Sequence, residues 1–180
     1  MSYTDDPSEM RPMALLDRDG VLNQDVGYPF RPDQIIWIDG ALDALASLHG
    51  AGYRVVVVTN QSGVGRGYYQ EADVHALHEW MAGVVRAHGG WISAFYYCPF
   101  SPEATIEAYR RDNHPDRKPN PGMLLKALSE FPTDIGRSLM IGDRDSDMVA
   151  AAAAGVQGFK FSGGNLDLFV QSALAEYQRE

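Results

Sequence analysis

The chain has 180 residues, of which 45% are hydrophobic and 22% are charged, a composition typical of one globular domain with a buried core. Its formal net charge of −9 disfavours sequence-independent binding to nucleic acid, which depends on lysine and arginine contacts with phosphate groups. No apolar run approaches the ~20 residues that a membrane span requires. Cys98 is the only cysteine, which excludes an intramolecular disulfide and is typical of a reducing compartment. We therefore expect a cytoplasmic protein that has no membrane association and works as a monomer.

The chain begins with residues 1–10, which are polar and acidic and lack the apolar segment of a signal peptide. We expect a flexible leader there, followed by a single domain over residues 11–180. Within that domain, short apolar or β-branched runs predict strands, and apolar residues at helical spacing predict helices. Strands are predicted at 13–16, 35–38, 55–58, 91–97, 138–141 and 156–161. Helices are predicted at 41–49, 71–87, 121–130, 146–154 and 165–178.

This alternation of strands and helices predicts an α/β fold with a doubly wound, mostly parallel sheet. The polar stretch 99–119 shows no periodicity. It is long for a loop without secondary structure, which indicates either a function or a contact that holds it in place.

Polar residues follow three of the predicted strands at the point where each strand ends. Asp17 and Asp19 follow the strand at 13–16, Thr59 and Asn60 follow the strand at 55–58, and Asp143 follows the strand at 138–141. Ligands of such sheets bind beyond the carboxyl ends of the strands, so we expect these side chains to meet at one edge.

The carboxylates in this group match two kinds of chemistry. Asp17 and Asp19 could divide nucleophilic attack and acid–base work between them, although the same pattern before Gly20 also fits a simple turn. Asp143 and Asp147 offer the oxygen ligands that Mg²⁺ prefers. Carboxylates at the start of the helix at 146–154 would also cap that helix, and the two roles are compatible.

Phosphate binding is the second chemistry that the pattern indicates. Thr59 and Asn60 offer a hydroxyl and an amide to phosphate oxygens, and backbone N–H groups of a turn at 61–63 could add to them. The alternative is an ordinary turn after a buried strand. Lys118 precedes a predicted helix and could neutralise charge on a transferred phosphoryl group, although most loop lysines are simply solvated.

Four ordered motifs carry a family resemblance: LLDRDGV at 15–21, VVTNQSG at 57–63, RKP at 117–119 and MIGDRDSDM at 140–148. Together they resemble the haloacid dehalogenase-like hydrolases. Within these, the chain is similar to the branch of histidinol phosphatases and D-glycero-D-manno-heptose 1,7-bisphosphate 7-phosphatases. The resemblance implies a Rossmann-like, haloacid dehalogenase-type fold, and the chain is too short for a large cap domain.

The resemblance also implies residue roles. Asp17 would be the nucleophile that forms an aspartyl-phosphate, Asp19 the general acid and base, and Thr59 and Lys118 would steady the phosphoryl group. Mg²⁺ would be held by Asp17, the Asp19 carbonyl and Asp143, with Asp147 behind these ligands. The substrate would be a small phosphorylated metabolite. The residues lining its binding site would be Asp25, Val26, Gly27, Tyr28, Asn60, Gln61, Ser62, Arg117 and Arg144.

One departure from the branch concerns zinc. Relatives often carry a Cys-x-His pair and a later Cys-x-Cys pair before the RKP motif, where this chain has CPF at 98–100 and HPD at 114–116. Cys98, His114 and Asp116 remain as candidate ligands, in a mixture that structural zinc sites rarely use. The alternative is that Phe100 packs the loop without metal and Cys98 is a small buried hydrophobe.

These observations predict a Mg²⁺-dependent phosphomonoesterase that acts on the 7-phosphate of a heptose 1,7-bisphosphate. Histidinol phosphate and the 3′-phosphate of a polynucleotide are the alternative substrates, and the acidic net charge disfavours the second. A different class, a phosphorylated receiver, would need an aspartate after its third strand, where this chain has Tyr97-Cys98-Pro99. A non-catalytic binding protein fits poorly with a full set of catalytic residues.

Overall fold

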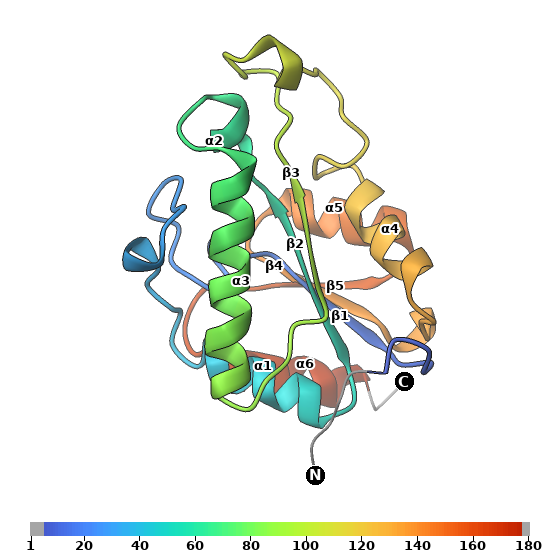
Figure 1. Ribbon diagram of the computed structural model, residues 1–180. Helices are drawn as coiled ribbons and strands as arrows, with labels where there is room; N and C mark the ends of the chain where they lie inside the picture. The colour runs from blue at the N-terminus through green and yellow to red at the C-terminus, as the bar shows by residue number, and fades with distance from the viewer. Residues whose placement is uncertain (1–5, 178–180) are drawn as a thin grey trace.

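The computed structural model describes residues 6–177, which form one five-stranded sheet in the order β3-β2-β1-β4-β5 (Figure 1). Every pair of neighbouring strands is parallel, as the alternation of elements predicts. The chain moves outward from β1 to β3 and then returns to the other side of β1, so the topological switch lies between β1 and β4. The strands are β1 (Met13–Leu16), β2 (Arg54–Asn60), β3 (Ala94–Cys98), β4 (Leu139–Gly142) and β5 (Gln157–Lys160).

Helices cover both faces of this sheet (Figure 1). The α-helices are α1 (Ala41–Gly50), α2 (Ser62–Gly65), α3 (Glu71–Ala87), α4 (Gly122–Glu130), α5 (Asp145–Ala154) and α6 (Leu166–Tyr177), and three short 3₁₀ helices lie at Pro32–Gln34, Glu107–Tyr109 and Ile135–Arg137. No helix within residues 6–177 has the length and apolar character needed to cross a membrane.

The three central strands, β2, β1 and β4, are buried on both sides, which explains why β2 is a continuous apolar run rather than an alternating one. Leu16, Val57 and Ile141 face one way and pack against α1, α3 and α6. Leu15, Val56 and Met140 face the other way and pack against α4 and α5. Two apolar layers therefore hold the sheet, and the polar residues that follow its strands are left at its carboxyl edge.

Two sequence predictions about local structure are wrong. Residues 35–38 form no strand, because they pair with the chain only through an isolated antiparallel bridge between Asn23 and Trp37. Residues 61–63 form no simple turn, because Ser62–Gly65 is a short helix, α2, and Gln61 is its N-cap. Residues 1–5 of the predicted leader and residue 178 of the last predicted helix lie outside the described residues.

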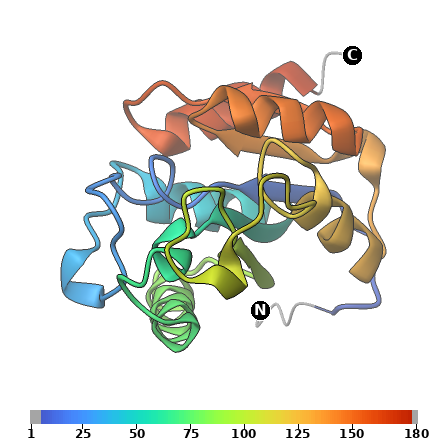
Figure 2. The ribbon, with the colours of Figure 1, turned by 90° about the horizontal axis from the view of Figure 1, so that it is seen from above.

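The long segment 99–119 is held over the carboxyl edge of the sheet, onto which Figure 2 looks. Backbone hydrogen bonds close it on itself between Ser101 and Tyr109 and tie it to α2 through Ile106 N and Gly65 O, which lie 3.0 Å apart. At its end, Asn60 binds the backbone of Lys118 twice: its Nδ2 donates to Lys118 O at 3.0 Å and its Oδ1 accepts from Lys118 N at 3.1 Å. This clamp places Lys118 beside the end of β1.

Candidate active site

A cavity of about 290 Å³ lies beyond the carboxyl ends of β1 and β2 and beside the first turn of α5. Its lining is Asp17, Asp19, Asp25, Gly27, Tyr28, Thr59, Asn60, Gln61, Ser62, Tyr69, Arg117, Lys118, Arg144, Ser146 and Asp147. Of the predicted substrate-binding residues, Val26 alone is not among them, and its side chain is 49% exposed. Tyr69 and Ser146 were not predicted. Ser146 stands inside the motif around Asp147, whereas nothing in the residue spacing marks Tyr69.

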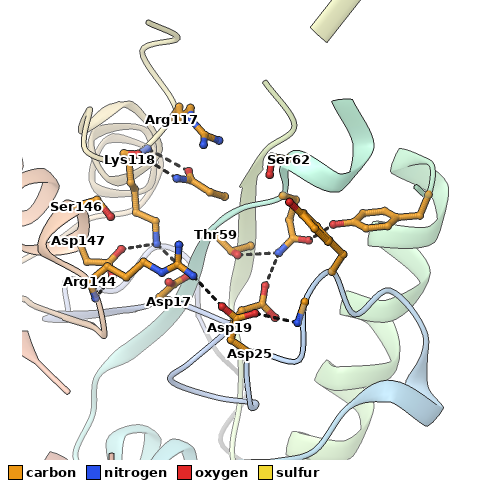
Figure 3. Close-up of a pocket in the computed structure, with 15 residues that line it drawn as sticks. Asp17, Asp19, Asp25, Thr59, Ser62, Arg117, Lys118, Arg144, Ser146 and Asp147 are labelled. Atoms are coloured by element: carbon orange, nitrogen blue, oxygen red, sulfur yellow. Dashed lines mark hydrogen bonds and ion pairs between the residues drawn. The ribbon is translucent and has the colours of Figure 1, made fainter. Parts of the chain in front are cut away.

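Lys118 lies at the floor of this cavity with its ammonium group enclosed by oxygen atoms (Figure 3). Its Nζ is 2.7 Å from Asp147 Oδ1, 2.9 Å from Val58 O and 3.0 Å from Asp17 Oδ1. The contact with Val58 O is a hydrogen bond, and the contacts with the two carboxylates are ion pairs. The lysine side chain is buried, and so are both carboxylates that it contacts. Lys118 is therefore a buried, paired lysine and not a solvated loop lysine.

Burial and charge set the proton affinities of this group. Burial raises the pKa of Asp17 to about 6; the nearby Lys118 opposes this shift, and the negative charges of Asp147 and Asp19 add to it. For Lys118, burial alone would lower the pKa, but the charges of Asp17 and Asp147 outweigh it and the pKa lies above its usual value. The lysine therefore stays charged, and its positive charge offsets the repulsion between the carboxylates of Asp17 and Asp147.

Asp17, Asp143 and Asp147 can each place one carboxylate oxygen within 4.8 Å of the other two. Oδ1 of Asp143 is buried and has no hydrogen-bond partner among the described residues. Burial, followed by the charge of Asp147, raises the pKa of Asp143. Three converging carboxylates with an unsatisfied oxygen fit a hard divalent cation such as Mg²⁺, which takes one or two carboxylates and keeps several waters.

Local backbone features place these acids. Gly20 has φ +92°, and a Cβ at that position would overlap the Asp143 carboxylate, so glycine lets the loop after β1 approach the loop after β4. Asp147 Oδ2 accepts a hydrogen bond from Arg144 N at 3.0 Å and so caps α5. The capping role is confirmed, and the same carboxylate also contacts Lys118.

The rim of the cavity is basic. Arg144 is 2.8 Å from Asp25 Oδ2 and joins the loop after β1 to the start of α5. Arg117 donates to Phe100 O at 3.1 Å. Tyr28, whose φ is +49°, packs edge-on against Tyr68 with ring centroids 4.9 Å apart. These residues come from the loop after β1, the end of the segment 99–119 and the start of α5.

The candidate zinc ligands do not converge. Cys98 Sγ is 3.9 Å from His114 Nδ1, but that nitrogen already accepts a hydrogen bond from Asp116 N at 3.1 Å. Within the part of the chain that the structure describes, the three residues do not bring one ligand atom each within 4.8 Å of the other two. Burial raises the pKa of the Cys98 thiol to about 11, and Phe100 stacks on His114 with centroids 4.0 Å apart.

Comparison with known proteins agrees with this site. The HAD-hydrolase-like family model matches residues 116–167, which carry Lys118, Asp143 and Asp147. The fold is that of a haloacid dehalogenase-like phosphatase, an enzyme that hydrolyses phosphate monoesters. The chain is 45% identical over 170 residues, or 94% of its length and 93% of the relative's, to D-glycero-β-D-manno-heptose-1,7-bisphosphate 7-phosphatase of Rhodopseudomonas palustris. This protein belongs to the family of D-glycero-D-manno-heptose-1,7-bisphosphate 7-phosphatases.

Two further relatives support the assignment. D-glycero-α-D-manno-heptose-1,7-bisphosphate 7-phosphatase of Burkholderia mallei is 45% identical over 148 residues, which cover 82% of this chain and 78% of the relative's. The structure of D,D-heptose 1,7-bisphosphate phosphatase from B. bronchiseptica, complexed with magnesium and phosphate, superposes with a TM-score of 0.78. That comparison covers 92% of this chain and 99% of the other, at 31% identity.

Replacing Lys118 by methionine should lower the free energy of unfolding by about 3 kcal/mol at pH 7.5, because two buried carboxylates lose their counter-charge. The deficit should shrink at pH 5, where protonation of Asp17 removes one of those charges. Urea unfolding at both pH values measures it. The exposed Lys126→Met is the matched control and should change stability by less than about 0.5 kcal/mol. Equal deficits at both pH values would contradict this electrostatic explanation.

His78 provides a pH test of the layer behind the site. Its Nε2 is 3.3 Å from Arg18 Nη1, and burial, with the charge of Arg18, lowers its pKa to about 3. The unfolded chain binds a proton near pH 6.5, so this histidine costs stability as pH falls from 6.5 towards 3, by up to about 1.4 kcal/mol per pH unit. We expect His78→Gln to reduce that slope in urea unfolding. An unchanged slope would mean that His78 is protonated in the fold.

Proposed function

We propose that this enzyme removes the 7-phosphate of D-glycero-D-manno-heptose 1,7-bisphosphate in a Mg²⁺-dependent reaction. The observation that carries the proposal is the distribution of charge in the cavity, which has Lys118 against Asp17 at its floor and two arginines, Arg117 and Arg144, among its lining. A bisphosphate bound at the floor through one phosphate presents the other to the rim, and arginine binds phosphate well. The names of the relatives with 45% identity support the same substrate.

The residues divide the chemistry as follows. Oδ1 of Asp17 is occupied by Lys118 at 3.0 Å and by Arg18 N at 2.7 Å, so Oδ2 attacks phosphorus. An aspartyl-phosphate forms as the bond to the sugar oxygen breaks, and Asp19 donates a proton to that oxygen. Asp19 then takes a proton from water, whose oxygen attacks phosphorus. This releases inorganic phosphate and restores Asp17.

The remaining polar groups stabilise charge. Thr59 and Lys118 lie where they can contact the oxygens of the transferred phosphoryl group. Asp17, Asp143 and the backbone carbonyl of Asp19 would hold Mg²⁺, which supplies positive charge to those oxygens when bound. Asp147 is engaged by Lys118 and by Arg144 N, so its role is to support the site rather than to take part in the reaction.

The substrate-binding residues fall into two groups. Asp25, Gly27, Tyr28, Ser62, Arg117 and Arg144 would meet the sugar and its second phosphate, and Val26, which does not line the cavity, has no role in this proposal. Both the nitrogen and the oxygen of the Asn60 side-chain amide are hydrogen-bonded to the backbone of Lys118. We therefore assign Asn60 to holding the lysine loop rather than to contact with the substrate.

The proposal also covers the oligomeric state of the enzyme, its cellular compartment and its zinc content. A monomer is supported by exposed apolar side chains that are scattered from Met10 to Leu168. A reducing, cytoplasmic compartment is supported by the single cysteine. We propose that no zinc binds at 98–116, because a thiol with a raised pKa and a histidine nitrogen that already accepts a hydrogen bond make a poor ligand set.

The substrate is tested by phosphate release with Mg²⁺ from four compounds: the α and β anomers of the heptose bisphosphate, histidinol phosphate and a 3′-phosphorylated oligonucleotide. We expect kcat/KM for at least one heptose anomer to exceed the other two classes by about 100-fold or more, because only a bisphosphate meets both the floor and the basic rim. Asp17→Asn should abolish turnover and keep the melting temperature. Asp33→Asn, at an exposed position in the 3₁₀ helix Pro32–Gln34, is its control. Histidinol phosphate as the best substrate would replace the proposal.

The metal site is tested separately by calorimetric titration of Mg²⁺. Asp143→Asn should weaken Mg²⁺ binding by about tenfold or more, because it removes one charged oxygen ligand. Asp145→Asn is a matched control two residues away, since that carboxylate is exposed and pairs with Lys160 at 2.7 Å. Equal affinities for the two variants would exclude Asp143 as a ligand.

A further inference from the structure

A buried polar network lies behind Asp19, and the roles assigned above do not use it. Arg18, Gln61, His78 and Tyr69 are 1%, 2%, 5% and 6% exposed, respectively. Burying polar groups costs free energy unless each finds a partner. The partners of these side chains lead to two residues of the proposed catalytic machinery, Asp19 and Thr59.

The orientation of the Gln61 amide follows from its neighbours. Arg18 can only donate, so its Nη2, 3.1 Å away, must face the amide oxygen Oε1. The Tyr69 hydroxyl donates to the same oxygen at 2.7 Å. The amide nitrogen Nε2 is thereby turned towards Asp19 Oδ2 and Thr59 Oγ1, both at 2.9 Å. Figure 3 shows the contacts of this amide nitrogen as dashed lines to Asp19 and Thr59.

Each of these bonds has a consequence for chemistry. Thr59 Oγ1 accepts a hydrogen bond from Gln61, so its own proton is free to point at a phosphoryl oxygen. Asp19 is fixed on both oxygens: Arg18 donates to both of them, Asn23 donates to Oδ1 at 2.9 Å, and Gln61 donates to Oδ2. A carboxylate that must protonate a leaving oxygen works only within hydrogen-bond reach, so fixing its position has catalytic value.

We infer that Gln61 and Tyr69 are positioning residues of this phosphatase: Tyr69 orients Gln61, and Gln61 orients Asp19 and Thr59. Both line the cavity, yet both ends of the Gln61 amide are already engaged by protein atoms. Gln61 therefore acts through its two partners and not through the substrate. This inference rests on the proposed roles of Asp19 and Thr59.

The test uses the dependence of the rate on the leaving group. Tyr69→Phe removes one hydroxyl and keeps the ring stacked on Phe30, 5.1 Å away. kcat/KM reports formation of the aspartyl-phosphate, which needs proton donation for a sugar oxygen but not for p-nitrophenolate. We expect kcat/KM to fall about tenfold on heptose bisphosphate and less than about threefold on p-nitrophenyl phosphate. Gln61→Leu should show the same selectivity with a larger loss.

Controls separate this inference from the proposed function. Tyr53→Phe also alters a tyrosine that is 6% exposed, but next to β2 at the opposite edge of the sheet, and should leave the ratio of the two kcat/KM values unchanged. Equal losses on both substrates, or none, in Tyr69→Phe would overturn the inference while Asp19→Asn still discriminates between them. If Asp19→Asn also lowers kcat/KM equally on heptose bisphosphate and p-nitrophenyl phosphate, both the acid–base role of Asp19 and this inference are wrong.

Discussion

The burial of one lysine charge is the constraint on which the rest of this structure depends. Lys118 is almost fully enclosed, and its ammonium is satisfied by Asp17, Asp147 and the carbonyl of Val58. A buried charge is tolerated only when it is paired and hydrogen-bonded. These partners come from the end of β1, the start of α5 and β2, so this one side chain joins three elements and the loop that carries it.

The same group explains how an acidic protein handles anionic substrates. Three carboxylates and one lysine leave excess negative charge at the floor, which favours a divalent cation and disfavours an uncompensated phosphate. Positive side chains at the rim, Arg117 and Arg144, then face the outer part of a bound molecule. The cavity nevertheless shares the acidic balance of the chain, whose net charge is −9, because its lining carries four aspartates against two arginines and one lysine.

Periodicity and strand-end residues predicted most of this arrangement. All five strands of the sheet and its parallel order follow from apolar runs, and Asp17, Thr59 and Asp143 meet because parallel strands share a carboxyl edge. The strand predicted at 35–38 failed because pairing depends on a partner that local sequence does not specify. Tyr69 was missed because its contact with Gln61 joins the two residues across α2, with no motif to mark it.

The sequence by itself therefore determined the class of fold and the edge at which Asp17, Thr59 and Asp143 gather, because these depend on residue type and on periods of 2 and 3.6 residues. The role of Lys118 followed from the family resemblance and not from its local pattern. Only the tertiary structure decided which oxygen each donor meets. Asn60 proved to clamp the lysine loop and Gln61 to face Asp19 and Thr59, since hydrogen bonds are set by positions to within tenths of an ångström. Such positions arise from packing between segments far apart in the chain.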